Sequence, residues 1–212
     1  MTDQEITGKQ GAKSAAARKL ICKAVTRCLA EIGYAETSIN RVIDRAGVSR
    51  GALQHHFPSK EDLMAATAQQ ILDNATFFRY SGASASAAER STAAELKETW
   101  EKVINTAEYR ALLEILIQVR TDKALRERLS PALQQWHRES MARTLSAYRS
   151  ASGSDPDVEM LITMNSCMMR GLVIQEQYTE DPAYIHQLMM RWIGMVSPLL
   201  IPREQNGAGT IN

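Results

Sequence analysis

The chain has 212 residues, of which 44% are hydrophobic and 23% charged, and its formal net charge is +1. No apolar stretch is long enough for a membrane span, and the N-terminus lacks an apolar signal core, so we expect a cytoplasmic protein with no membrane partner. Strand patterns are scarce while Ala, Leu, Met, Glu, Gln and Arg abound, which predicts an all-α fold of about nine helices.

The near-neutral total hides an uneven distribution of charge. Residues 1–60 carry ten Lys and Arg against five Asp and Glu, a net charge of +5, and the remaining residues carry a net charge of −4. A cationic N-terminal module on a mildly acidic body is typical of a protein that is attracted to phosphates at one end.

The first part of the chain divides into an arm and a helix. Residues 1–13 are polar and basic, which predicts a flexible arm that either follows a DNA backbone or minor groove or has no specific role. From Ser14 to Ile32, apolar residues recur at helical spacing and Gly33 follows. We expect this helix to brace the segment that comes next, in a DNA-binding domain at residues 14–58.

Two short amphipathic runs on either side of Gly47 form the central pattern of the sequence. In residues 39–46 the apolar positions share one face of a helix, and Ser38 stands at its N-cap. Ser49 is placed to cap a second short helix, which Pro58 stops. A helix, a short turn containing glycine and a second helix are the helix-turn-helix signature.

The outward face of the second helix is rich in hydrogen-bond donors and has no carboxylates. The side chains opposite the apolar Leu53 and Phe57 are those of Arg50, Gly51, Ala52, Gln54, His55 and His56. Arginine and glutamine bond base edges in the major groove, and small residues allow close approach or contact thymine methyl groups. We predict a DNA-binding surface that also includes Ser38 and Ser49. The alternative is an ordinary solvated helix in a small bundle.

A new helix is predicted directly after this pattern. Ser59 and Asp62 form a capping box, so a helix begins at Lys60 and runs to about Arg79. The charge of Lys60 in the first turn opposes the helix dipole, and a nearby phosphate would resolve that conflict. We therefore predict that Lys60 contacts the DNA backbone and that this helix is the lever between the DNA-binding part and the body.

The segment AGVSRGALQHHFPSKEDL resembles the DNA-binding signature of the tetracycline-repressor (TetR) family of bacterial transcription regulators. The resemblance is strong from about Arg18 to Met64 and is weaker in the YRALLEILIQVRTDKALRERL and MRGLVIQ stretches. The family usually has aromatic residues where Gln54 and His56 stand, and a small residue where Ile43 stands. The resemblance implies a repressor, a backbone contact by the lysine that begins the lever helix, and a small lipophilic or aromatic inducer.

A helical regulatory and dimerisation domain is predicted for residues 59–202, with a flexible linker at 81–86 and a disordered tail at 203–212. The last two helices have broad apolar faces, and two copies of each would form a four-helix dimer interface. A dimer also places two recognition helices one DNA turn apart. The predicted interface residues are Met160, Leu161, Leu172, Gln175, Ile185, Leu188, Met189, Trp192 and Val196. The alternative is burial of these residues within a monomer.

Soft and aromatic side chains in the body are candidates for an adaptable apolar cavity, joined by a few polar groups that would orient a ligand. The predicted ligand-binding residues are Trp100, Tyr109, Trp136, His137, Met141, Met164, Asn165 and Met168. Each is also compatible with an ordinary core or surface position.

No metal, cofactor or catalytic motif stands out, so we predict that the chain is not an enzyme. His55 and His56 are adjacent and diverge by about 100° on a helix, which is poor geometry for chelating one metal. Cys22, Cys28 and Cys167 contain no CxxC pair, and we expect buried reduced thiols.

Together these patterns predict a sequence-specific regulator that binds a palindromic, double-stranded operator as a homodimer. A small-molecule effector in the C-terminal domain would move the lever helix and release the DNA. The alternative is a helical adaptor that binds another protein through the Met-rich segment 160–169 and does not respond to a ligand.

Overall fold

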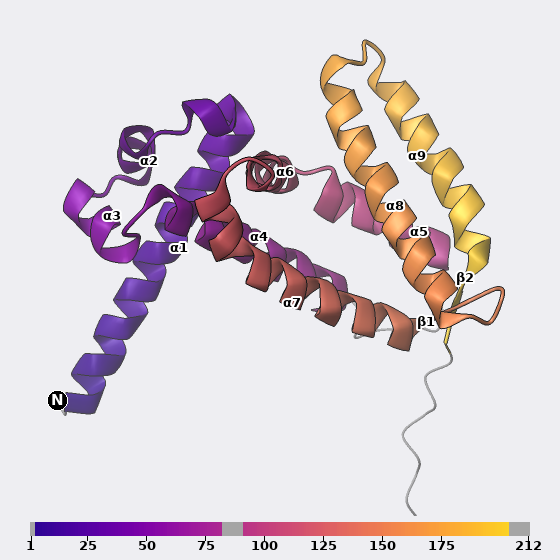
Figure 1. Ribbon diagram of the computed structural model, residues 1–212, viewed down its shortest axis with the longest axis horizontal. Coiled ribbons are helices and arrows are strands. Elements are labelled where there is room, and N and C mark those ends of the chain that lie inside the picture. Colours follow the sequence, from indigo (N-terminus) through magenta and orange to yellow (C-terminus); the bar gives the residue numbers. More distant parts are fainter. Residues whose placement is uncertain (1–2, 82–90, 204–212) are drawn as a thin grey trace, which may run out of the picture. The chain divides into compact units, whose positions relative to one another are not determined.

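The computed structural model describes residues 3–81 and 91–203 (Figure 1). Within these ranges the chain forms nine α-helices and one short two-stranded sheet, which confirms the all-α prediction. No helix in the described ranges is both long and apolar enough to cross a membrane. The helices group into two compact units: among the described residues, unit 1 holds 3–75 and 107–135, and unit 2 holds 76–81, 91–106 and 136–203.

Unit 1 contains the helix-turn-helix and the helices that support it. Its helices, in whole or in part, are α1 (Asp3–Glu36), α2 (Ile39–Ala46), α3 (Arg50–His56), α4 (Lys60–Ser81), α6 (Ala107–Val119) and α7 (Lys123–Ala147). Both α2 and α3 pack beside α1, which also contacts α6 (Figure 1). The core that joins them includes Ile21, Val25, Leu29, Val42, Leu53, Phe57, Leu63, Leu112, Ile115 and Leu125, all buried. Burial of these apolar side chains holds the short helices α2 and α3, which are too short to be stable alone.

The first helix is longer than the sequence predicts. It begins at Asp3, so residues 3–13 lie in α1, where the sequence predicts a flexible arm. The predicted break at Gly33 is present: this residue has φ 73° and ψ 176°, a positive φ that favours glycine. A Cβ added there would also lie 3.3 Å from Oε2 of Glu114. The same carboxylate oxygen accepts a hydrogen bond from the Tyr34 N–H at 2.8 Å, which fastens the end of α1 to α6.

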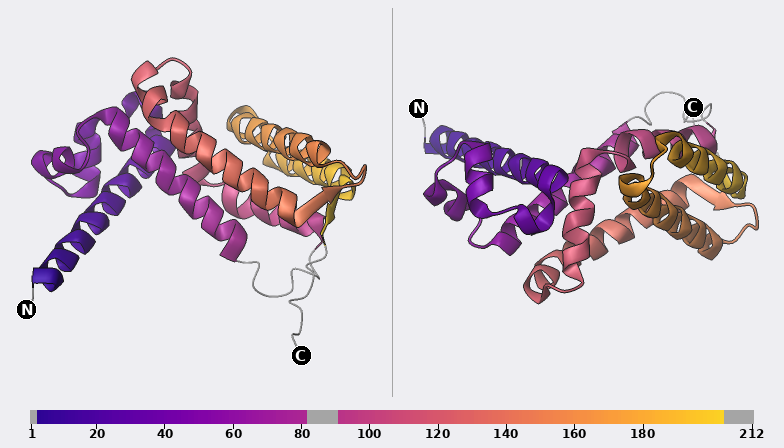
Figure 2. Two further views of the ribbon diagram at one scale, coloured as in Figure 1. Left: turned by 60° about the horizontal axis from the view of Figure 1, so that its bottom comes forward. Right: turned by 90° about the horizontal axis from the view of Figure 1, so that it is seen from above.

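Unit 2 is built around the last two long helices. Its elements are α5 (Thr92–Thr99), a π-helical turn (Trp100–Ile104), β1 (Tyr148–Ser150), α8 (Asp155–Gln175), α9 (Pro182–Val196) and β2 (Leu200–Pro202), with the C-terminal parts of α4 and α7. The α8 and α9 helices lie side by side and run in opposite directions (Figures 1 and 2). The buried core includes Leu96, Trp100, Val103, Val158, Leu161, Met169, Leu172, Ile185, Met189, Ile193 and Val196.

A short antiparallel sheet, which the sequence does not predict, joins the two ends of the α8–α9 pair. Tyr148 pairs with Pro202, and Ser150 pairs with Leu200. Arg203, assigned to the tail in the sequence analysis, is anchored here: its Nε donates to the Tyr148 carbonyl at 2.9 Å. The rest of the predicted tail and all but the first residue of the predicted linker lie outside the described residues.

The three cysteines have two different environments. Cys22 and Cys28 are buried, as predicted, and burial raises the pKa of both thiols, which keeps them protonated and poorly nucleophilic. The prediction is wrong for Cys167, which is exposed on α8. The helical period places it on the apolar stripe of this helix, but that stripe faces outward at this position.

Candidate DNA-binding surface

The turn between α2 and α3 has the local geometry that its residues predict. The Ser38 hydroxyl accepts a hydrogen bond from the Arg41 N–H at 3.3 Å and caps α2. Gly47 ends this helix in the left-handed conformation, with φ 65° and ψ 34°, and its N–H donates to the Ile43 carbonyl. The Ser49 hydroxyl then accepts from the Ala52 N–H at 3.2 Å and starts α3. Local capping thus fixes both helices of the motif.

The structure separates the inner and outer faces of α3 clearly. Leu53 and Phe57 are only 1% and 2% exposed and point into unit 1. The predicted reading residues Arg50, Gly51, Ala52, Gln54 and His55 are exposed, and His56 is half-buried. The capping residues Ser38 and Ser49 are exposed too. The outer face of α3 therefore presents donors and small side chains to solvent.

The two arginines of α2 are already paired with carboxylates. Arg41 contacts Glu36 at 3.1 Å, and Arg45 contacts Glu31 at 2.6 Å. The hydrogen bond from Arg45 lowers the pKa of Glu31. In these pairs the arginines neutralise the carboxylates of Glu31 and Glu36 beside the helix-turn-helix. The two carboxylates therefore do not repel an approaching anion.

Arg50, the first residue of α3, has a neutral partner. Its Nη2 donates a hydrogen bond to Oδ1 of Asn40 on α2, and both residues are exposed. Sequence reasoning missed Asn40, because nothing in the spacing of two residues on separate helices says that their side chains meet. The pair lies across the helix-turn-helix turn and places the guanidinium at the start of the recognition helix.

A second missed residue, Arg18, completes the far end of α3. Its Nη1 donates to the His56 carbonyl at 2.7 Å, and its guanidinium lies 4.4 Å from the centroid of the Phe57 ring. A cation favours the C-terminus of a helix, where carbonyls lack partners, and the ring face adds a cation–π contact. Arg18 thus ties the recognition helix to α1.

Lys60 differs from its predicted role in one respect. Its ammonium lies 4.5 Å from the centroid of the Tyr34 ring and is half-buried, so the charge has a local partner that the sequence analysis did not foresee. A cation–π contact of this kind contributes about 0.5–1 kcal/mol at an exposed site, which is weak enough for a phosphate to compete. A backbone contact by Lys60 stays a prediction.

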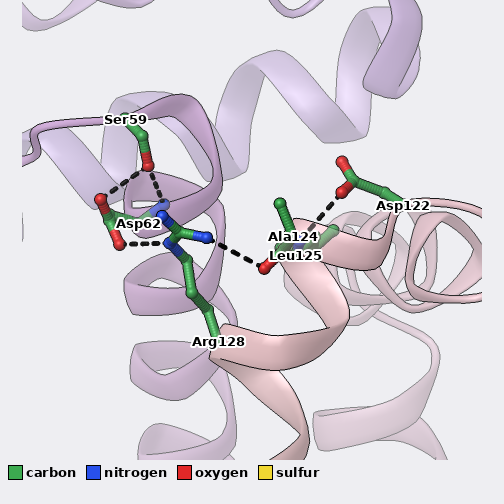
Figure 3. Close-up of polar contacts among 6 residues, drawn as sticks. All are labelled: Ser59, Asp62, Asp122, Ala124, Leu125 and Arg128. Atoms are coloured by element: carbon green, nitrogen blue, oxygen red, sulfur yellow. Dashed lines mark hydrogen bonds and ion pairs between the residues drawn. The ribbon is translucent and has the colours of Figure 1, made fainter.

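The start of α4 is fastened to α7 by a small polar network (Figure 3). Oγ of Ser59 accepts from the Asp62 N–H at 3.0 Å and donates to Oδ2 of that carboxylate at 2.6 Å, as the predicted capping box requires. The second carboxylate oxygen accepts from Nε of Arg128 on α7 at 2.7 Å. Arg128 also donates to the Ala124 carbonyl. The first turns of α4 and α7 are therefore linked.

Replacing Asp62 with alanine should lower the free energy of unfolding at pH 7 by about 1–2 kcal/mol, because it removes the hydrogen bond from the Ser59 hydroxyl and one partly exposed ion pair with Arg128. Hydrogen bonds from Ser59 and Arg128 lower the pKa of Asp62 from its ordinary 3.8, so this stabilisation is present above the ordinary pKa. It is lost as the pH falls through the depressed folded-state value.

Thermal melts of wild type and Asp62→Ala should therefore differ at pH 7 and converge only when the pH falls below the depressed folded-state pKa of Asp62, itself below 3.8. Asp44→Ala, which removes an exposed carboxylate from α2, serves as the control and should melt with the wild type at both pH values. Equal melting of Asp62→Ala and wild type at pH 7 would show that the network adds no stability.

The predicted ligand residues are not all placed to line a cavity. Tyr109 belongs to unit 1, and the other seven belong to unit 2. His137 and Met164 are exposed. The buried Asn165 has partners already: its Oδ1 accepts from Trp192 Nε1 at 3.0 Å. The remaining candidates are the buried Trp100 and the half-buried Trp136, Met141 and Met168.

The predicted dimer residues also divide into two groups. Five are buried within unit 2: Leu161, Leu172, Ile185, Met189 and Val196. Met160 is 59% exposed, and Gln175, Leu188 and Trp192 are half-buried. The exposed apolar side chains of this region that the sequence analysis did not assign to the interface are Met164, Ile174, Tyr178, Tyr184, Met195 and Leu199.

Known proteins resemble this chain in sequence and fold. The model of the tetR family of bacterial regulatory proteins matches residues 21–67. An HTH-type transcriptional regulator of Mycobacterium tuberculosis is 28% identical over 161 residues, which cover 71% of this chain and 80% of the relative. The HTH-type transcriptional repressor AcnR of Corynebacterium glutamicum is 40% identical over 60 residues, which cover 28% of this chain and 32% of AcnR.

Solved structures agree on the fold. A transcriptional regulator from Saccharomonospora viridis in complex with choline superposes with a TM-score of 0.65 at 18% identity, over 89% of this chain and 100% of that one. Salmonella enterica GusR gives a TM-score of 0.60 at 21% identity, over 85% of this chain and 95% of that one.

A helix-turn-helix whose second helix presents an exposed, carboxylate-free face, carried on a larger helical body, defines a DNA-binding transcriptional regulator. Residues 21–67 carry the DNA-binding signature of the TetR family of bacterial regulatory proteins, and the comparisons support a TetR-family regulator. This confirms the resemblance seen in the sequence and the prediction that the chain is a regulator and not an enzyme.

Proposed function

We propose that the protein is a repressor that binds a palindromic operator as a homodimer and leaves it when a small lipophilic or aromatic ligand binds in the C-terminal domain. The observation that carries the proposal is the exposed outer face of α3, with Arg50, Gln54 and His55 directed to solvent. In this scheme residues 14–58 bind DNA, and residues 59–202 regulate and dimerise.

The outer face of α3 fits the major groove. The major groove of B-DNA is wide enough to admit one α-helix. Arginine bonds the edge of guanine there, and glutamine bonds the edge of adenine. Gly51 and Ala52 have little or no side chain, which lets the backbone of α3 approach the bases. Lys60, at the start of the next helix, would leave the Tyr34 ring for a backbone phosphate.

The exposed apolar side chains of α8 and α9 support a dimer. Met160, Met164 and Ile174 recur along α8, and Tyr184 and Met195 lie on α9, all at least 48% exposed. Exposed apolar surface of this kind marks interaction sites. We take the partner to be a second copy of this chain. A dimer would cover the exposed apolar surface, and it would also supply the second helix-turn-helix, because one helix-turn-helix reads only half a site.

Support for a ligand comes from the size and composition of unit 2 and from the relative that is solved with choline. Trp100, Trp136, Met141 and Met168 offer the soft, aromatic lining that small-molecule sites use. The lever in this scheme is α4, which has residues in both units and is linked to α7 by Asp62 and Arg128. Ligand binding would lower the operator affinity by the factor by which the ligand binds the released arrangement more tightly than the DNA-bound arrangement.

The experiment has two stages. Purified protein is used to select binding sites from random duplex DNA, and affinity for the selected site is then measured from 50 to 200 mM salt, where phosphate contacts give a steep negative dependence. We expect a palindromic consensus and such a slope. A helical adaptor would show neither.

The ligand arm uses a thermal-shift screen of small molecules that includes choline. A compound that raises the melting temperature should weaken operator binding in a gel-shift titration. If a bound compound leaves operator affinity unchanged, the release mechanism is wrong, although DNA reading by α3 would stand.

A further inference from the structure

We infer that Asn40 is a positioning residue for base recognition: it holds the Arg50 guanidinium in the orientation from which that side chain reads a guanine. The inference rests on the proposed function, because it concerns how the outer face of α3 discriminates sequences. It starts from the hydrogen bond at 2.5 Å between Arg50 Nη2 and Asn40 Oδ1.

The chemistry of the acceptor matters. Arg41 and Arg45 are paired with carboxylates, whereas the partner of Arg50 is a neutral amide. An amide oxygen fixes the guanidinium without cancelling its charge, so attraction to DNA is kept. A guanidinium has five N–H donors, and one bond to Asn40 leaves donors for the O6 and N7 acceptors of guanine.

The placement of Asn40 makes it a suitable support. It lies in the first turn of α2, between the capping residue Ser38 and the buried Val42, so its backbone is fixed at both sides. Arg50 follows the capping residue Ser49 at the start of α3. The side-chain amide of Asn40 thus links α2 to α3, whose relative position is set by the turn at Gly47. Its hydrogen bond fixes the guanidinium of Arg50 relative to both helices.

Fixing Arg50 in the free protein should favour specific binding. An arginine side chain has many rotamers, and ordering them during binding costs affinity. When Asn40 orders the guanidinium in the free protein, the side-chain entropy of Arg50 is lost during folding and no longer reduces the affinity for DNA. The gain in affinity appears only at a DNA site whose guanine lies where the ordered guanidinium points. Asn40 therefore contributes more to sequence preference than to non-specific affinity for DNA.

A double-mutant cycle on the full-length protein tests this. Affinities are measured for a selected site and for the same site with the guanine opposite Arg50 replaced, using wild type, Asn40→Ala, Arg50→Ala and the double variant. Asn40→Ala should weaken binding to the selected site by about three- to tenfold, part of the rotamer freedom of an arginine. It should weaken binding to the altered site much less, and it should have no effect in the Arg50→Ala background.

Two further variants sharpen the reading. Asn40→Asp should weaken binding to the selected site more than Asn40→Ala does, because a carboxylate pairs with Arg50 and repels phosphate. Asn74→Ala, at an exposed asparagine on α4, is the matched control and should bind as wild type does. Circular dichroism melts confirm that each variant is folded.

The outcomes separate the inference from the proposed function. An equal loss from Asn40→Ala with and without Arg50 would mean that the amide acts on its own, and no loss would mean that it does not act; either result overturns the positioning role. Wild-type protein that prefers no DNA sequence would refute the proposed function itself.

Discussion

Replacing Arg50 with alanine is expected to weaken binding to a selected operator site by about 5- to 150-fold, since one good bidentate contact contributes about 1–3 kcal/mol of discrimination. The loss should be specific, with little change in affinity for random duplex DNA. Arg50 is exposed, and its hydrogen bond to Asn40 is on the surface, so the fold and the melting temperature should be preserved. Fluorescence anisotropy with labelled duplexes measures both affinities.

A matched control distinguishes base reading from loss of charge. Arg126→Ala removes one exposed arginine from α7, outside the recognition surface, and should leave both affinities nearly unchanged. Lys60→Ala should weaken specific and random binding alike and make the salt slope shallower by about one. Should Arg50→Ala keep the sequence preference of wild type, base reading would have to come from elsewhere.

Replacing Met164 with glutamate is expected to convert the protein to monomers at micromolar concentration and to weaken operator binding by about 100-fold or more, because avidity between two half-sites is lost. Met164 is 48% exposed in the apolar stripe of α8, so a charge there is tolerated by the monomer but not by a buried interface. Analytical ultracentrifugation gives the oligomeric state, and anisotropy gives the affinity.

Ile117→Glu provides the comparison, because Ile117 is similarly exposed, at 52%, but lies on α6 in unit 1. It should remain a dimer. A Met164→Glu protein that is still dimeric would remove α8 from the interface, and a monomeric wild type would remove the dimer altogether.

The helix-turn-helix was predictable from sequence because its determinants are local. Ser38, Gly47 and Ser49 act on backbone groups within a few residues, and Ser59 and Asp62 form their capping box across one turn. Such short-range geometry depends little on the rest of the chain. The outward direction of α3 followed from the spacing of its two apolar residues.

The parts that sequence reasoning missed all depend on residues far apart in the chain. The β1–β2 pairing joins Tyr148 to Pro202, and the support of α1 joins Tyr34 to Glu114. Neither contact has a spacing signal. Asn40 and Arg18 were overlooked for the same reason, since their partners lie on other helices.

The predicted dimer face illustrates a different limit. The apolar stripes of α8 and α9 are wide enough to meet two neighbours, and periodicity does not say which edge turns inward. The structure uses Leu161 and Met189 for the core of unit 2 and leaves Met160 and Met164 in solvent. We therefore propose Met164 as an interface residue.

The most direct test of the account is site-specific cross-linking from α3 to DNA. A photoreactive amino acid replaces the exposed Gln54, or the exposed Arg126 as a control, and the cross-linked nucleotides of a selected palindromic site are mapped. We expect position 54 to mark two symmetry-related clusters whose centres are about one helical turn of DNA, or a multiple of it, apart, and position 126 to mark none. Absence of cross-links from position 54 on DNA that the protein binds, or a cluster in one half-site alone, would contradict it.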